Sequence, residues 1–206
     1  MSDTGIDWTN RNLSEADLSN REMIGEDLTG VNLTDTNMSD SDLSKSKLIG
    51  AKLLRANMSN SNMYGVNLYG ANLSHANMSN ARFSGSIMFG TKIVRANLTD
   101  ADLNEVDLCW SNLARSCVVR ANLSKSDLTD ANLPNTDLSG ANLSGVKLLR
   151  ANLSDANLSG SVLSDARLSG ANLRGANLLG AEISGAIGLH LADLTGATMP
   201  DGSIHD

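Results

Sequence analysis

Large aliphatic side chains recur at every fifth position along nearly the whole chain. Steps of five from Leu13 to Ile183 give 35 positions, all of which hold Leu, Met, Ile, Phe or Val, and 25 of them hold Leu. A second series of mostly small residues lies two positions before the first. Asn or Asp stands between the two series in most units. This pattern indicates one repeated five-residue unit instead of a succession of different elements.

A five-residue period fits neither an α-helix nor a straight β-strand. On a helix each step turns the next leucine by about 140°, and on a strand an odd step sends alternate leucines to opposite faces. Both series face inward only if the chain turns a corner after every unit, so four units close a square coil. We therefore predict an all-β rod of about nine coils, stacked at the spacing of neighbouring strands and about 40 Å long.

The unit, seen clearly in ANLSG at 141–145, resembles the A-(D/N)-L-X-X consensus of the pentapeptide-repeat family. The resemblance extends from residue 11 to about residue 187. It implies a right-handed quadrilateral β-helix, a form of β-solenoid. The tail MPDGSIHD at 199–206 resembles the ending of many cyanobacterial members, so the chain is most similar to those.

The two ends depart from the repeat. We expect residues 1–10 to form an N-terminal cap segment, residues 11–187 the solenoid, and residues 188–206 a C-terminal cap and tail. Three large polar residues occupy the small series in the first coil, which is therefore expected to be a distorted cap: Arg11, Arg21 and Glu26. Gly188 takes a leucine position and the next match is displaced by one residue, so the rod is expected to stop near residue 186. The tail then covers an open edge that otherwise invites aggregation.

The charge of the chain is acidic overall and unevenly distributed. The net charge is −7 and the sequence pI is about 4.9, which argues against direct nucleic-acid binding. Residues 43–125 nevertheless carry ten basic and four acidic side chains, between two acidic regions. The sequence contains no apolar run long enough to span a membrane, and its start lacks the features of a signal peptide. We expect a cytoplasmic protein that has a basic middle.

Catalytic and metal-binding patterns are missing from the sequence. Its three histidines, His75, His190 and His205, are too far apart to form a set, and the recurring Asp residues lie in the outward position of the repeat. Cys109 and Cys117 fall on opposite sides of the square, beyond the reach of a disulfide. No phosphate-binding loop or nucleophile elbow is present. We predict neither an enzyme nor a site for a metal or cofactor.

The stretch SIMFGTKIVR at 86–95 keeps the inward series but changes the outward residues. If positions twenty apart stack, it belongs to an apolar surface that we call the aromatic stripe: Ile49, Tyr64, Tyr69, Phe89 and Trp110. The following face carries what we call the basic column: Lys52, Arg55, Lys92, Arg95 and Arg115. Stacked aromatic residues stabilise sheets, but apolar patches with a charged rim also mark interfaces. The sequence leaves both interpretations open.

Three functions follow from these observations. The first is a non-catalytic rigid scaffold that binds an unidentified protein partner through the stripe and the column. The second comes from the family resemblance, because some members protect DNA gyrase by imitating duplex DNA; the basic middle and the Leu-rich core count against it. The third is ice recognition by a regular Asn-X-Ser face. The chain is expected to be a monomer or a homodimer joined end to end or face to face.

Overall fold

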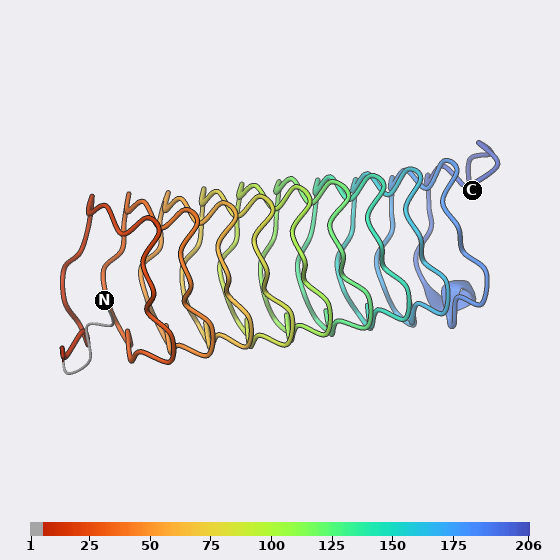
Figure 1. Cartoon of the computed structure of the whole chain (residues 1–206). Helices are drawn as coiled ribbons and strands as arrows, with labels where there is room; N and C mark the ends of the chain where they lie inside the picture. Colours follow the sequence, from red (N-terminus) through yellow and green to blue (C-terminus); the bar gives the residue numbers. More distant parts are fainter. Residues whose placement is uncertain (1–5) are drawn as a thin grey trace.

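The computed structural model describes residues 6–206 and confirms a quadrilateral β-helix. Each five-residue unit places one residue in an isolated parallel bridge with the residue twenty positions later, as in Asn12 with Asn32 and Asn32 with Lys52. Figure 1 shows the result, a single stack of square coils that makes up most of the described residues. The one helix within residues 6–206 is a 3-10 turn, η1, at Leu189–Leu191.

Neighbouring coils are joined by backbone hydrogen bonds on every side. The Leu13 N–H donates to the Asn32 carbonyl over 2.8 Å, and the Asn32 N–H donates to the Arg11 carbonyl over the same distance. This exchange repeats along the rod. Each coil therefore depends on the coils before and after it, as expected for a solenoid.

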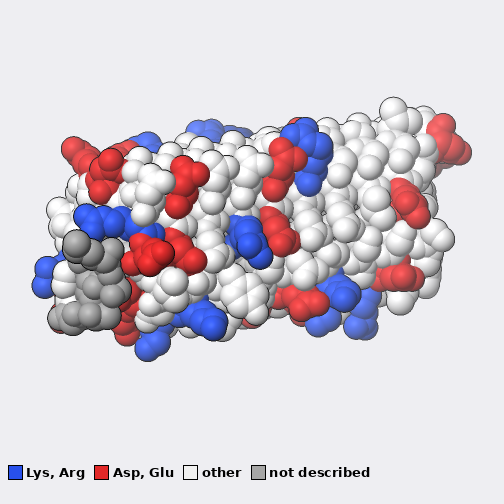
Figure 2. All heavy atoms as spheres, in the orientation of Figure 1, with Lys and Arg blue, Asp and Glu red and all other residues white. Residues whose placement is uncertain are grey.

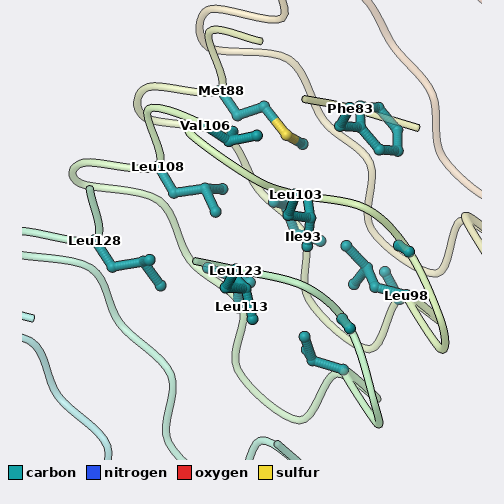
Figure 3. Packing of buried hydrophobic residues seen from close by; sticks show 14 of the residues in the cluster. Phe83, Met88, Ile93, Leu98, Leu103, Val106, Leu108, Leu113, Leu123 and Leu128 are labelled. Atoms are coloured by element: carbon teal, nitrogen blue, oxygen red, sulfur yellow. The ribbon is translucent and has the colours of Figure 1, made fainter. Parts of the chain in front are cut away.

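The two inward series form the core. Every member of the large apolar series from Leu28 to Leu178 is fully buried. Figure 3 shows part of this core, in which the side chains labelled between Phe83 and Leu128 point into the tube from successive coils. Buried hydroxyls in the small series are paired with the backbone. The Ser61 hydroxyl donates to the Met58 carbonyl over 2.6 Å, and the Ser46 hydroxyl donates to the Met23 carbonyl over 2.6 Å. Ser and Thr therefore replace Ala without leaving an unpaired polar atom.

The turns between successive units, which form the corners of the square coil, account for the remaining polar positions of the unit. The last residue of each unit has a left-handed backbone, with a φ of 58° at Asp40 and 59° at Asn60. Asn, Asp and Gly tolerate this conformation better than other residues. The Asn or Asp at the second position of the unit supports the turn with its side chain. In one unit the Ser59 N–H donates to Asn57 Oδ1 over 3.2 Å. The polar positions of the consensus therefore reflect what each corner of the coil requires, and they repeat because the corner repeats.

Asparagine side chains form a ladder along one face. Asn57 Nδ2 donates to Asn37 Oδ1 over 3.0 Å, and Asn77 Nδ2 donates to Asn57 Oδ1 over 3.0 Å. The same Asn57 Oδ1 also accepts the Ser59 N–H and hydroxyl. The polar groups of the Asn-X-Ser face, which the sequence analysis considered for ice recognition, are thus hydrogen-bonded to one another. This favours a structural role for that face.

The first coil is regular, contrary to the expected distortion. Its bridges and turns match those of later coils. Arg11 and Arg21 are exposed and Glu26 is half-buried, because these positions lie at the end of the stack, where large side chains reach solvent. Trp8 lies five residues before Leu13 and packs against the core. Of the segment expected to cap this end, residues 1–5 lie outside the described residues.

The ladder continues past residue 186, where the sequence predicts its end. The turn η1 accommodates the one-residue displacement, and Asp193 and Thr198 then bridge to Asn172 and Asn177. Thr198 also pairs with Ile204 in antiparallel fashion. The last residues therefore fold back against the final coil, and we keep residues 188–206 as a proposed cap.

Candidate functional site

The aromatic stripe is built from equivalent positions of successive coils. The Gly50 N–H donates to the Tyr69 carbonyl over 2.9 Å, and the Gly70 N–H donates to the Phe89 carbonyl over 3.0 Å. These bonds fix Ile49, Tyr69 and Phe89 one above the other. The β-helix thus brings together side chains that are twenty residues apart in sequence.

Tyr69 and Phe89 stack on each other. Their ring centroids are 5.5 Å apart and their planes differ by 3°. One face of each ring is therefore covered by the other ring. The stack contributes to the stability of the sheet as well as to its surface, so both interpretations of the stripe keep support.

Two other members of the stripe, Tyr64 and Trp110, are exposed, and Ile87 adds one further apolar side chain to this surface. Tyr64 is 48% exposed, Ile87 43% and Trp110 63%. Tyr64 Cε2 lies 4.0 Å from the position that a Cβ on Gly85 would take, so its ring leans toward the coil that carries Ile87 and Phe89. Sequence reasoning missed Ile87. The signal was present, because Ile87 replaces the Asn or Asp that normally occupies the bridging position.

The basic column lies on the next face, but its members differ. Arg55 donates two hydrogen bonds of 2.6 Å to the Asp35 carboxylate. These bonds hold the pKa of Asp35 below its usual value, so the charge of Arg55 is already paired. The remaining four members form no ion pair within residues 6–206: Lys52, Lys92, Arg95 and Arg115.

A glycine corner separates the stripe from the column. Gly50 and Gly70 are exposed, and a Cβ built on either residue meets no atom within 4 Å. Gly90 continues this line one coil further, and Trp110 occupies the same corner in the coil after that. The corner is therefore an open strip of backbone with apolar side chains on one side, basic side chains on the other and Trp110 at one end.

Trp110 is a large apolar residue at an exposed corner. Its backbone has a φ of 58°, as the corner residues of the other units do, and most of its side chain is exposed to solvent. The same corner position holds glycine in the three preceding coils. Trp110 thus differs from the preceding residues of its corner by its large exposed side chain and not by its backbone conformation.

The described residues offer little chemistry beyond this surface. Within residues 6–206 no group of three or more His, Cys, Asp or Glu residues is placed to hold a metal ion, and no cavity is present. Cys109 and Cys117 are both free thiols. Burial, with hydrogen bonds involving Asp127 and Asp107, raises the pKa of Cys109 to about 12. None of the helices in the described part of the chain has the length and apolar character needed to cross a membrane.

Acidic side chains dominate elsewhere on the surface, where several are paired between coils. Arg120 donates hydrogen bonds of 2.8 and 2.6 Å to Asp100, and Arg150 donates bonds of 2.7 and 2.6 Å to Asp130. On the face drawn in Figure 2, acidic and basic side chains lie beside each other in the middle of the rod, and acidic ones alone are visible at its C-terminal end.

The five-residue unit and the square coil agree with comparisons to known proteins. The family model for pentapeptide repeats matches eight times, and the matches together extend over residues 12–199. The chain belongs to the pentapeptide-repeat family. A comparison with curated proteins finds no match.

Two solved pentapeptide-repeat structures illustrate the relationship. HetL, a protein involved in heterocyst differentiation regulation from the cyanobacterium Nostoc sp. strain PCC 7120, is 35% identical, with a TM-score of 0.58; the alignment covers 97% of this chain and 93% of HetL. A trypsin-treated variant of QnrB1, a plasmid-mediated fluoroquinolone resistance protein, is 19% identical, with a TM-score of 0.51; the alignment covers 87% of this chain and 90% of QnrB1. The second similarity is one of fold, while the first confirms the likeness to cyanobacterial members.

Proposed function

We propose that this pentapeptide-repeat protein is a non-catalytic rigid scaffold that binds another protein through the aromatic stripe and the basic column. The observation that carries the proposal is the exposure of Trp110, whose large apolar side chain is 63% exposed on the surface of the rod. An exposed apolar patch around such a residue commonly marks an interaction site. Exposed Tyr64, Tyr69 and Ile87 lie in the same region and enlarge the apolar patch.

The composition of the surface supports a protein partner. Trp, Tyr and Arg are the residues that most often dominate the energy of protein interfaces, and the patch contains all three. Its shape is that of a flat, continuous face built on a rigid core, which suits a macromolecular partner better than a small molecule. The proposal includes a cytoplasmic location, which rests on the sequence expectation.

The gyrase-protecting alternative has weaker support from this surface. A rod that imitates DNA requires rows of unpaired carboxylates. Here Asp35, Asp100 and Asp130 are each bound by an arginine of the next coil, and a basic column interrupts the acidic surface. A supercoiling assay with gyrase and ciprofloxacin tests the alternative directly, and protection at micromolar protein would revive it.

A capture experiment with matched variants tests the proposed function. The full chain is immobilised and exposed to a lysate of the organism that makes it, in parallel with the double variant Phe89→Ser/Arg95→Ser. The control is Val119→Ser/Arg120→Ser, which removes a half-buried apolar side chain and an arginine from equivalent positions on another face. We expect proteins that are retained by the wild type and the control but lost from the stripe variant. Identical capture by all three proteins rejects the proposal.

A further inference from the structure

We propose that the segment recognised by this surface is an acidic, extended stretch of a partner protein, lying along the glycine corner between the aromatic stripe and the basic column. This inference rests on the proposed function and specifies the chemistry of its partner. Four features of the described residues support it: unpaired like charges, the orientation of two rings, the open corner and the charge of the rest of the rod.

The first feature is the stacking of like charges. Arg95 and Arg115 occupy equivalent corners of consecutive coils, and neither forms an ion pair within residues 6–206. Like charges on adjacent strands destabilise a sheet. At comparable corners the molecule places opposite charges instead, as in Asp100 with Arg120. The unpaired arginines are therefore available to carboxylates from outside the chain.

Lys52 and Lys92 add to this positive surface. They belong to one line of bridges in which Lys52 pairs with Asn72, and Asn72 with Lys92. Both lysines are exposed and lie across the glycine corner from the stripe. Carboxylates placed over the glycine corner would thus meet two rows of cationic groups. Lys52 and Lys92 form the first row, and Arg95 and Arg115 at the following corner form the second.

The second feature is the geometry of Tyr69 and Phe89. Their parallel rings face each other, so one face of each ring is covered by the other ring. The edge of an aromatic ring carries partial positive charge and its face partial negative charge. Because one face of each ring is covered, less of the negative ring surface is left to attract cations, and fewer faces are left on which a base or sugar could stack.

The third feature is the corner itself. The backbone at Gly50 and Gly70 is exposed and has no side chain over it, so another chain can approach it closely. The strip between the coils of Ile49 and Trp110 spans three coil spacings, or about 14 Å. An extended segment of about four residues has this length. Trp110 then stands at the end of the segment.

The fourth feature is the surrounding charge, which distinguishes a protein segment from a nucleic acid. The chain has a net charge of −7, with acidic regions on both sides of the basic middle. A long polyanion would meet repulsion beyond the column, whereas a short acidic segment would lie within it. The stacking of Tyr69 on Phe89 also covers one face of each ring, which reduces the aromatic surface on which the bases of a single-stranded nucleic acid could stack.

Fluorescence anisotropy with the full chain tests this inference. The probe is a fluorescein-labelled peptide of eight residues that alternates glutamate and leucine; the comparison probes are the same peptide with lysine for glutamate, and a twelve-nucleotide oligothymidine. We expect binding of the glutamate peptide alone, weakened as salt is raised. Equal binding of the lysine peptide, tighter binding of oligothymidine, or no binding of the glutamate peptide overturns the inference.

Charge reversal locates the binding. The variant Lys92→Glu/Arg95→Glu is expected to weaken glutamate-peptide binding by about tenfold or more, since attraction becomes repulsion at two sites. The control Lys125→Glu/Arg167→Glu reverses two exposed charges elsewhere and is expected to leave the affinity within about twofold. Equal losses in both variants would mean non-specific attraction and would reject the site.

The two proposals fail in distinguishable ways. If the Phe89→Ser/Arg95→Ser variant loses captured proteins while the glutamate peptide does not bind, the scaffold function stands and the acidic chemistry is wrong. If capture is unchanged in that variant, the surface is not an interface, and the inference falls with the function on which it rests.

Discussion

The rings of Tyr69 and Phe89 lie parallel, with centroids 5.5 Å apart and planes that differ by 3°. Twenty residues separate them in sequence, yet the square coil places them directly above one another. The contact affects both the fold and the surface, because it stabilises adjacent coils and also covers one face of each ring. Measurements of stability and of binding on matched variants separate these two contributions.

Truncation of one core leucine should destabilise the middle of the rod strongly. Leu103 is fully buried between neighbouring coils. We expect Leu103→Ala to lower the free energy of unfolding by about 2–5 kcal/mol, because it removes buried methyl groups and leaves a cavity. Urea unfolding followed by far-UV circular dichroism measures the change. The comparison is Arg167→Ala at an exposed position, and an equal loss there would contradict a core effect.

Removal of one basic-column residue should stabilise the fold while weakening binding. Arg115 has a left-handed backbone, with a φ of 60°, and is exposed beside Arg95. Glycine relieves the left-handed strain at some cost in chain entropy, so Arg115→Gly is expected to raise the free energy of unfolding by up to about 1 kcal/mol. Thermal and urea unfolding provide the measurement.

Arg55→Gly is the matched control for this prediction. It relieves the same backbone conformation but removes the hydrogen bonds to Asp35, so we expect a smaller gain or none. A clear loss of stability in Arg115→Gly would show that the arginine contributes to the fold and would weaken the functional interpretation.

Acid should destabilise the protein over a defined pH range. Partial burial acts to raise the pKa of Asp127, but hydrogen bonds from Thr129 and Lys147 outweigh it and hold the pKa at about 2. The folded pKa lies below the unfolded one, so this contribution is present above about pH 4 and is lost as the pH falls toward 2. Asp35, Asp100 and Asp130 have pKa values lowered in the same direction.

The acid prediction is checked by urea unfolding at pH values between 7 and 2. We expect stability to fall below about pH 4 and the fall to be shallower in Asp127→Asn, since asparagine keeps the acceptor without the titration. A wild-type stability that rises as the pH is lowered through this range would contradict the assignment.

Cys109 should be unreactive in the folded protein. Burial raises the pKa of its thiol to about 12, so the reactive thiolate is almost absent at pH 8. We expect Cys109→Ser to leave the extent of iodoacetamide labelling of the native protein unchanged, as measured by intact mass. Unfolding in urea should expose the second thiol in the wild type, and rapid native labelling at Cys109 would contradict the burial.

The mass in solution decides whether the stripe is used for self-association. Both ends of the rod are acidic, which opposes end-to-end stacking, so we expect a monomer by light scattering at physiological salt. A wild-type dimer that becomes monomeric on Phe89→Ser would show that a second copy of the chain covers the stripe.

The square-coil architecture can be read from the repeat alone. A large residue every fifth position, with a small one two places earlier, has one compact arrangement, and the pattern from Leu13 to Ile183 is regular enough to assign residues to faces. The positions of Ile49, Tyr69 and Phe89 followed from counting in twenties. Such reasoning succeeds because every unit obeys the same local geometry and each contacts the same neighbours.

The tertiary structure decided what each surface residue does. It showed that Arg55 is bound by Asp35, that Ile87 joins the apolar patch and that the ladder extends to Thr198. Counting in steps of twenty residues predicts which face and coil a side chain belongs to. It predicts neither the rotamer of that side chain nor the charge of the residue that it contacts. These depend on contacts between coils and at the ends of the stack, where the repeat no longer supplies identical surroundings.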